Sequence, residues 1–162
     1  MHTPEPREPR FLADAMLERL ARWLRVLGFD TASGSAATDA ELVRRAKEEH
    51  RALLTRDRRL AQQWSVPDSL LVVRDEPIEQ LREVISHFRL TVPRQLFTRC
   101  LLCNTRLRPV SAEEVRSRLP PAAREGPQTL RCCPNCGRVY WEGSHTRRMR
   151  AALEGARQRW QS

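Results

Sequence analysis

Residues 11–30 read FLADAMLERLARWLRVLGFD. The first three residues are apolar, as in a short buried strand, and Asp14 follows them directly. Apolar side chains then recur at three- and four-residue spacing from Leu17 to Leu27, which predicts a helix with one buried face. Gly28 is suited to end that helix. The stretch therefore predicts a strand, an acid at the end of the strand, and an amphipathic helix.

The same order recurs twice further along the chain. Residues 52–57 read ALLTRD and residues 70–75 read LLVVRD, so each predicted strand again ends close to an aspartate. Helices are predicted over residues 38–50, after Asp57, and from Pro77 onward. Strands that alternate with helices indicate an α/β fold with a mostly parallel sheet covered by helices.

The character of the chain changes near residue 98. We predict a flexible tail over residues 1–9, an α/β domain over 10–97, and a small cysteine-containing module with a basic C-terminal helix over 98–162. Two short strands near 129–131 and 138–141, joined by a cysteine turn, and a helix over 146–160 are expected there. A short helix is also predicted over residues 111–118, with Ser111 and Glu114 as a capping box.

Two Cys-x-x-Cys pairs, RCLLCN (residues 99–104) and CCPNCG (residues 132–137), carry the metal prediction. Four thiolates complete the shell of a tetrahedral structural zinc ion. Unligated thiols or a redox dithiol are the alternatives. Cys132 has the wrong spacing for a ligand and is expected to be a small buried residue. The predicted zinc ligands are Cys100, Cys103, Cys133 and Cys136.

Three aspartates, Asp14, Asp57 and Asp75, stand just beyond the three apolar runs, and Asp39 opens a predicted helix. The carboxyl ends of parallel strands meet at one edge of a sheet, where ligands bind. Carboxylates that converge repel one another and favour a bound cation, and oxygen ligands suit Mg²⁺ or Mn²⁺. Such ions support the hydrolysis of a phosphodiester by water. Helix capping is the alternative for Asp75, and a first-turn helix charge is the alternative for Asp39.

The charge of the chain permits a nucleic-acid partner, and a GC-rich genome is the alternative explanation for its many arginines. The 162 residues carry 29 basic and 20 acidic side chains, for a net charge of +9, and Lys47 is the one lysine. Residues 1–97 hold 16 basic and 15 acidic side chains, whereas residues 98–162 hold 13 and 5. Guanidinium groups suit phosphates. If nucleic acid binds, the basic C-terminal part is where we expect it to bind.

Three side chains are predicted to contact RNA: Arg22, Arg25 and Trp141. Arg22 and Arg25 could line a phosphate path, or they could form a solvated helix face. Trp141 could stack on an unpaired base or pack in the small core of the C-terminal module. The sequence contains no run of about 18 apolar residues, so it predicts no membrane span. The first ten residues lack the apolar stretch of a signal peptide. A cytoplasmic protein is expected.

Five segments resemble the Mut-seven C-terminal RNase family, which joins a PIN-like nuclease domain to a four-cysteine zinc ribbon. They are residues 11–30, TDAELVRRA (38–46), ALLTRDRRLA (52–61), RCLLCN (99–104) and CCPNCGRVYWEGSH (132–145). The resemblance implies a PIN-like three-layer α/β/α sandwich and a metal-dependent ribonuclease. It also implies that Asp14, Asp39 and Asp57 are the catalytic ligands of Mg²⁺ or Mn²⁺.

Glu41 and Asp75 are additional candidates for that acidic site. Glu41 also stands three residues after Thr38, the spacing of a helix capping box. Many PIN-like proteins have a further acid two residues after the T-x-D aspartate, and this chain has Arg59 there. On the resemblance and the predicted aspartates together, we expect a ribonuclease that cleaves RNA endonucleolytically. The rivals are an RNA-binding protein without turnover and an adaptor that docks to a protein partner in an RNA-processing assembly.

Overall fold

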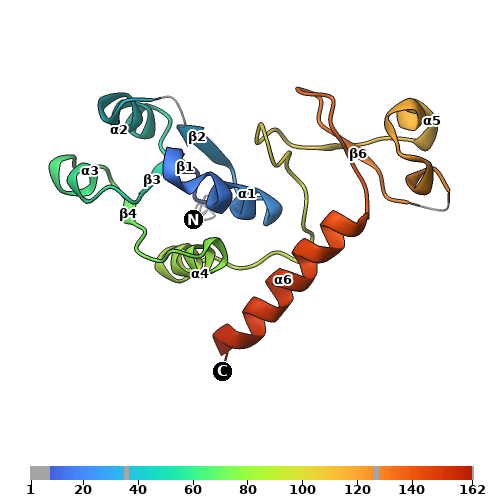
Figure 1. The fold of residues 1–162 in the computed structure, drawn as a ribbon. Helices are drawn as coiled ribbons and strands as arrows, with labels where there is room; N and C mark the ends of the chain where they lie inside the picture. The colour runs from blue at the N-terminus through green and yellow to red at the C-terminus, as the bar shows by residue number, and fades with distance from the viewer. Residues whose placement is uncertain (1–7, 35–36, 126–127, 162) are drawn as a thin grey trace, which may run out of the picture. The chain divides into compact units, whose positions relative to one another are not determined.

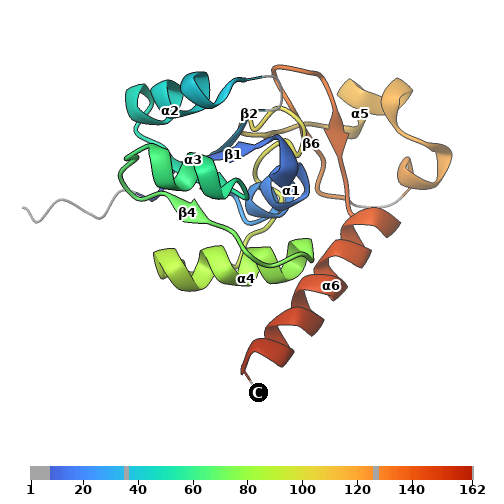
Figure 2. The ribbon, with the colours of Figure 1, turned by 60° about the vertical axis from the view of Figure 1, so that its left-hand side comes forward.

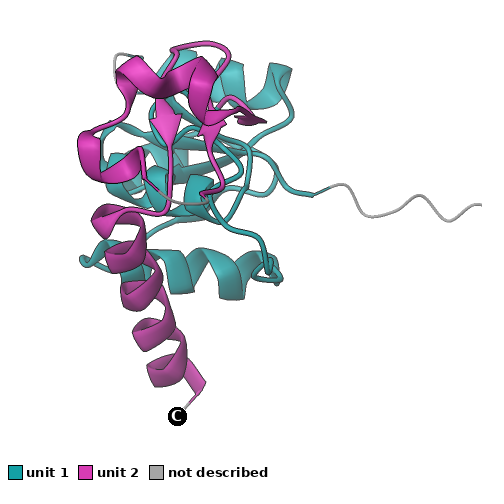
Figure 3. Ribbon diagram, turned by 90° about the vertical axis from the view of Figure 1, so that its right-hand side faces the viewer, with its two compact units in different colours: residues 1–104 teal, residues 105–162 magenta. Residues whose placement is uncertain are grey.

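The computed structural model describes residues 8–34, 37–125 and 128–161. The chain forms two compact units, Met1–Asn104 and Thr105–Ser162, which Figure 3 colours separately. The first unit holds the predicted α/β fold, and the second holds a small antiparallel sheet and the terminal helix. No helix in the described part of the chain is long and apolar enough to span a membrane.

The first unit is built on a four-stranded parallel sheet. Its strands are β1 (Phe11–Asp14), β2 (Thr31–Gly34), β3 (Ala52–Thr55) and β4 (Leu70–Leu71), in the order β2-β1-β3-β4 (Figure 1). Every neighbouring pair is parallel, so all four strands point the same way. The two central strands, β1 and β3, therefore end side by side at the carboxyl edge of the sheet.

Helices cover both faces of this sheet. Figure 1 shows α2 (Asp39–Glu48) and α3 (Arg58–Gln63) to the left of the strands, with α1 (Glu18–Val26) and α4 (Pro77–Phe88) on the other side of the sheet, and Figure 2 shows the same helices from a second direction. Alternate residues of β1 reach the two faces. Leu12 packs in a core with Leu42 and Leu60, whereas the ring of Phe11 contacts Phe88 at a centroid distance of 5.1 Å. The predicted α/β fold with a mostly parallel sheet is confirmed as three layers.

Two strands differ from the sequence pattern. Residues 31–34, TASG, carry no apolar run, yet they form β2 because all four pair in register with β1. β4 has only two residues, although an apolar run extends to Val73. Val72 N still donates to Thr55 O at 2.8 Å, but the Val73 side chain is 58% exposed, so the chain leaves the sheet there.

The amino ends of the three longer strands are tied together by ion pairs. Arg10, Asp30 and Arg51 directly precede β1, β2 and β3. Asp30 accepts a hydrogen bond from Arg51 Nη1 at 2.6 Å and from Arg10 Nε at 3.2 Å, and Asn104 Nδ2 donates to it at 2.7 Å. Burial raises the pKa of Asp30, but the bonds from Arg51 and Asn104 outweigh burial and hold that pKa at about 2.

The second unit contains a three-stranded antiparallel sheet in the order β5-β6-β7. Its strands are β5 (Arg108–Pro109), β6 (Arg131–Cys132) and β7 (Val139–Tyr140). The expected hairpin near 129–131 and 138–141 is present as β6 and β7, whereas β5 was not predicted. The helices are α5 (Ala112–Val115), followed by the short 3₁₀ turns η2 (Arg116–Arg118) and η3 (Pro121–Ala123), and the basic α6 (Ser144–Gln161).

Ser111 caps α5 as the sequence predicts. Its hydroxyl accepts a hydrogen bond from Glu114 N at 3.2 Å. The helix is shorter than expected and continues only as the 3₁₀ turn η2. The second unit has a small hydrophobic core of five buried residues: Val115, Leu119, Ala123, Leu130 and Val139.

Candidate functional site

Asp14 closes β1 at the carboxyl edge of the sheet and is held by three donors. Its Oδ2 accepts hydrogen bonds from Thr55 Oγ1 at 2.5 Å and Arg56 N at 3.0 Å, and its Oδ1 accepts from Met16 N at 2.9 Å. The residue is 7% exposed. A carboxylate offers about four lone-pair positions, so one position on Oδ1 is left for a further ligand.

Asp57 lies at the same edge, two residues beyond the end of β3. Its Oδ1 caps α3 by accepting from Arg59 N at 2.7 Å and Leu60 N at 3.2 Å. Its backbone N donates to Thr55 Oγ1 at 2.9 Å, so one threonine hydroxyl joins Asp57 to Asp14. Oδ2 of Asp57 accepts no hydrogen bond from the described residues, which leaves it available to a ligand.

The other predicted acids are placed differently. Asp39 is the first residue of α2 and is exposed, and no described side chain pairs with it. Glu41 completes a capping box in which Thr38 N donates to Glu41 Oε2 at 2.8 Å. The backbone hydrogen bond from Thr38 lowers the pKa of Glu41. The Asp75 side chain is 87% exposed and pairs with Arg56 Nη2 at 2.7 Å. It makes no helix-capping bond, and the N-cap residue of α4 is Glu76.

The three aspartates do not form a ready-made three-ligand group. Among residues 8–34, 37–125 and 128–161, one group of three or more His, Cys, Asp or Glu side chains lies close enough together to hold a metal ion. That group consists of cysteines and contains no aspartate. Asp14 and Asp57 share a hydrogen-bond network, and Asp39 stands outside that network. The donors of Asp14 and Asp57 are carboxylate oxygens, which suit Mg²⁺ or Mn²⁺, and Mg²⁺ needs only one or two carboxylates beside water and phosphate.

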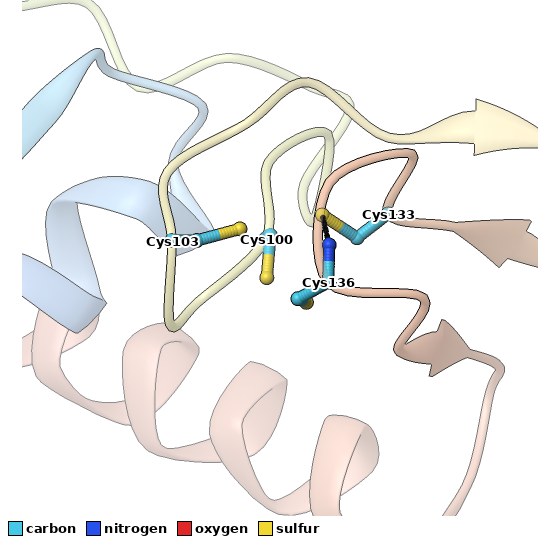
Figure 4. A group of neighbouring side chains, drawn as sticks. All are labelled: Cys100, Cys103, Cys133 and Cys136. Atoms are coloured by element: carbon cyan, nitrogen blue, oxygen red, sulfur yellow. Dashed lines mark hydrogen bonds between the residues drawn. The ribbon is translucent and has the colours of Figure 1, made fainter.

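The four predicted cysteines do gather. The sulfur atoms of Cys100, Cys103, Cys133 and Cys136 all lie within 4.8 Å of one another (Figure 4). A tetrahedral ion with Zn–S bonds of about 2.3 Å places its thiolates about 3.8 Å apart. The four thiols can therefore bind a metal ion such as zinc. Cys132 is buried and lies outside this group, as the spacing predicts.

The two cysteine turns share one backbone design. The residue after each second cysteine, Asn104 or Gly137, has a positive φ, +67° and +74° respectively. Its N–H donates to the carbonyl of the first cysteine, from Asn104 to Cys100 at 3.0 Å and from Gly137 to Cys133 at 2.9 Å. Cys136 N also donates to Cys133 Sγ at 3.4 Å. The backbone thus presents the thiols of each pair on one tight turn.

Comparison with family models gives one match to this chain. The model of the Mut7-C RNAse domain matches residues 9–153. The chain belongs to the Mut7-C RNAse domain family. Comparisons with curated proteins and with solved structures found no match. Membership in this family indicates a ribonuclease-type function, with RNA as the class of substrate.

The Mut7-C domain places the three predicted RNA-binding residues in different settings. Arg22 is exposed on α1. Trp141 is half-buried and packs against the core of the second unit. Arg25 is only 1% exposed, and its guanidinium donates to protein oxygens. Arg25 therefore cannot reach RNA from this position and is removed from the RNA-binding set.

Sequence reasoning missed two residues that shape the Mut7-C site. Thr55 is 1% exposed and joins the two acids, although the T-x-D spacing alone drew attention only to Asp57. Met16 follows Asp14 by two residues and is 70% exposed, the most exposed large apolar side chain described. Its backbone N–H donates to Asp14 Oδ1, so the turn after β1 helps to orient the Asp14 carboxylate.

Proposed function

We propose that this chain is a metal-dependent ribonuclease with a PIN-like catalytic domain and endonucleolytic action. The observation that carries the proposal is the pair Asp14 and Asp57, joined through the Thr55 hydroxyl at the ends of adjacent parallel strands. Family membership supplies the reaction class. In this proposal Mg²⁺ or Mn²⁺ is held by Asp14 and Asp57, and Asp39 adds the third carboxylate.

The chain's own residues define the chemistry at this edge. A bound divalent ion would lower the pKa of an attacking water and offset charge on the phosphodiester. Thr55, Arg56 and Met16 orient the Asp14 carboxylate by donating to it. Asp57 is oriented by the first turn of α3 and keeps Oδ2 available. These bonds fix both carboxylates before a ligand arrives, which is the preorganisation that catalysis requires.

We propose that the four cysteines bind structural zinc and that the basic second part of the chain positions RNA. Residues 98–162 hold 13 basic against 5 acidic side chains, and α6 carries five of these arginines. Such a surface binds phosphates through charge and therefore weakens as salt rises. Arg22 and Trp141 are candidates for direct RNA contacts.

The experiment is cleavage of an end-labelled single-stranded RNA by the full chain with Mn²⁺. We expect Asp14→Asn and Asp57→Asn to abolish internal cleavage while zinc content and RNA affinity persist. Asn keeps the helix-capping ability of Asp57, so folding is preserved. Asp68→Asn is the matched control. Asp68 is exposed and lies two residues before β4, at the amino edge of the sheet, opposite the edge that holds Asp14 and Asp57. Cleavage that survives both site substitutions would place the catalytic centre elsewhere.

A second candidate is an RNA-binding or adaptor protein without turnover. The observations that favour it are Arg59 in place of a further acid and the position of Asp39 outside the Asp14–Thr55–Asp57 network. Salt-dependent RNA binding without cleavage, across single-stranded and structured RNAs with Mg²⁺ and Mn²⁺, would favour the binding protein. Metal-dependent cleavage would exclude it.

A further inference from the structure

Arg25 is a buried cation in the first unit. It lies in α1, and its side chain is 1% exposed. Its Nε donates to Thr31 O at 2.9 Å and its Nη2 donates to Ser33 Oγ at 2.6 Å, so two of its nitrogens are fixed on β2. A buried guanidinium is tolerated only when protein acceptors replace water. The remaining nitrogen, Nη1, must therefore find its acceptors elsewhere.

Those acceptors lie in the first cysteine turn. Nη1 donates to Leu101 O at 2.7 Å and to Leu102 O at 3.3 Å. Leu101 and Leu102 are the two residues between Cys100 and Cys103. The ion-pair partner described for Arg25 is Glu18, at 3.3 Å and partly exposed. Arg25 thus directs its charge and two hydrogen bonds at the backbone that sets the spacing of two thiols.

Further bonds tie the same turn to the start of β2. Asn104, the left-handed residue that closes the turn, accepts from Thr31 N at 2.9 Å and donates to Asp30 Oδ1 at 2.7 Å. Arg99 donates to Gly28 O and to Asn104 O, both at 2.9 Å. Arg25 differs from these residues because it donates to both carbonyls between the cysteines and is itself fully buried.

We propose that Arg25 is a positioning residue for the metal site. By holding the carbonyls of Leu101 and Leu102, it fixes the turn on which Cys100 and Cys103 present their thiolates. The inference rests on the proposed binding of zinc by the four cysteines. Four thiolates around one Zn²⁺ carry a net negative charge, so a buried guanidinium bound to the same turn also stabilises the loaded site.

The arrangement couples metal binding to the stability of the α/β unit. When the turn loosens on loss of metal, Nη1 of Arg25 loses acceptors while its other nitrogens stay buried against β2. A coupling of this kind is reciprocal, so zinc stabilises the fold around Arg25 and Arg25 strengthens the retention of zinc. The metal is therefore expected to stabilise the first unit as well as the small sheet of the second.

The test compares zinc release from the full chain in four forms: wild type, Arg25→Met, Arg25→Lys and Val43→Ala. Val43 is buried in the core on the α2 side of the sheet, so its truncation lowers stability without touching the cysteine turn. Zinc release to a chromophoric chelator is followed at a temperature where every form is folded. The shift in melting temperature caused by chelation is measured alongside.

We expect Arg25→Met to release zinc at least tenfold faster than wild type, the order of effect seen for residues that orient metal ligands. Arg25→Lys keeps a charge but cannot supply the same set of donors, so we expect an intermediate rate. Val43→Ala should release zinc at the wild-type rate. The shift in melting temperature on chelation should be smaller in Arg25→Met than in wild type.

Two failures are distinguishable. A wild-type chain that binds no zinc refutes the proposed zinc site and this inference with it. A wild-type chain with one zinc, together with an Arg25→Met variant that releases zinc no faster than Val43→Ala, refutes the inference alone. If Arg25→Met does not fold, Arg25→Lys decides the matter, and a release rate equal to that of Val43→Ala overturns the proposal.

Discussion

The hydroxyl of Thr55 donates to Asp14 Oδ2 at 2.5 Å, although the two residues stand 41 positions apart in the chain. β1 and β3 are neighbouring parallel strands, so their carboxyl ends bring Asp14 and Thr55 together. The same hydroxyl accepts from Asp57 N at 2.9 Å. Thr55 is therefore the link through which two acids from different strands form one site.

Removal of the Thr55 hydroxyl should reduce cleavage of RNA. In Thr55→Val the side chain keeps its shape, but Asp14 loses a buried donor and Asp57 N loses its acceptor. We expect the cleavage rate at saturating RNA to fall about 10- to 100-fold, and more Mn²⁺ to be needed. Thr55→Ser keeps the hydroxyl and should retain most activity. Equal activity in the valine and serine variants would contradict this role.

Asp57 should show two separable roles. Asp57→Ala removes the cap of α3 as well as the carboxylate, and we expect a loss of about 1 kcal/mol in the free energy of unfolding by urea. Asp57→Asn keeps a capping oxygen and should stay within about 0.5 kcal/mol of wild type while losing cleavage. If the asparagine variant is as unstable as the alanine variant, the capping of α3 does not account for the stability that Asp57 provides.

Asp30, at the amino edge of the sheet, should make the stability of the fold depend on pH. The pKa of Asp30 is lowered from 3.8 to about 2, so its ion pairs stabilise the fold above about pH 4 and are lost as pH falls through 2. We expect Asp30→Asn to be less stable at pH 7 and to lose less stability than wild type between pH 4 and pH 2. Urea midpoints measured across this range provide the test.

The control for that series is Asp68→Asn, because Asp68 is exposed and makes no ion pair with the described residues. Its pH profile should follow wild type. A wild-type profile that is flat from pH 4 to pH 2, or one that Asp30→Asn reproduces fully, would contradict the role given to Asp30.

Removal of the metal should disrupt the second unit. Its sheet has strands of only two residues and a core of five buried apolar residues, so little apolar burial supports it. We expect chelation, or Cys133→Ser with Cys136→Ser, to abolish zinc binding and expose residues 105–143 to protease. Loss of one zinc per chain with an unchanged protease pattern and unchanged far-UV circular dichroism would show that the metal is not structural.

Local patterns predicted most elements of the first unit. The spacing of apolar residues predicts α1, and Thr38 with Glu41 predicts the start of α2, because helix periodicity and capping are local properties. β2 escaped prediction because its TASG residues gain strand structure from pairing with β1 and not from their own propensity. The cysteine group was predictable because its ligand spacing is itself a local signal.

Contacts between distant segments could not be predicted in the same way. Arg25 falls beside the apolar stripe of α1, where a solvated or RNA-facing position is the natural expectation. Residues 101 and 102, more than 75 positions away, cover that side and bury the guanidinium. The acids were predicted to share one edge, and Asp14 and Asp57 meet through Thr55. The shared ion, and Asp39 as its third ligand, stay predictions.

The most direct measurement is a crystal structure of the full chain soaked in Mn²⁺, with anomalous difference maps locating the ion. We expect a peak about 2.1 Å from a carboxylate oxygen of both Asp14 and Asp57, the distance of an octahedral oxygen-ligated ion. The same peak should be absent from Asp14→Asn crystals. Wild-type crystals that show no ion between these two carboxylates, at a Mn²⁺ concentration that supports cleavage, would contradict the proposed catalytic site.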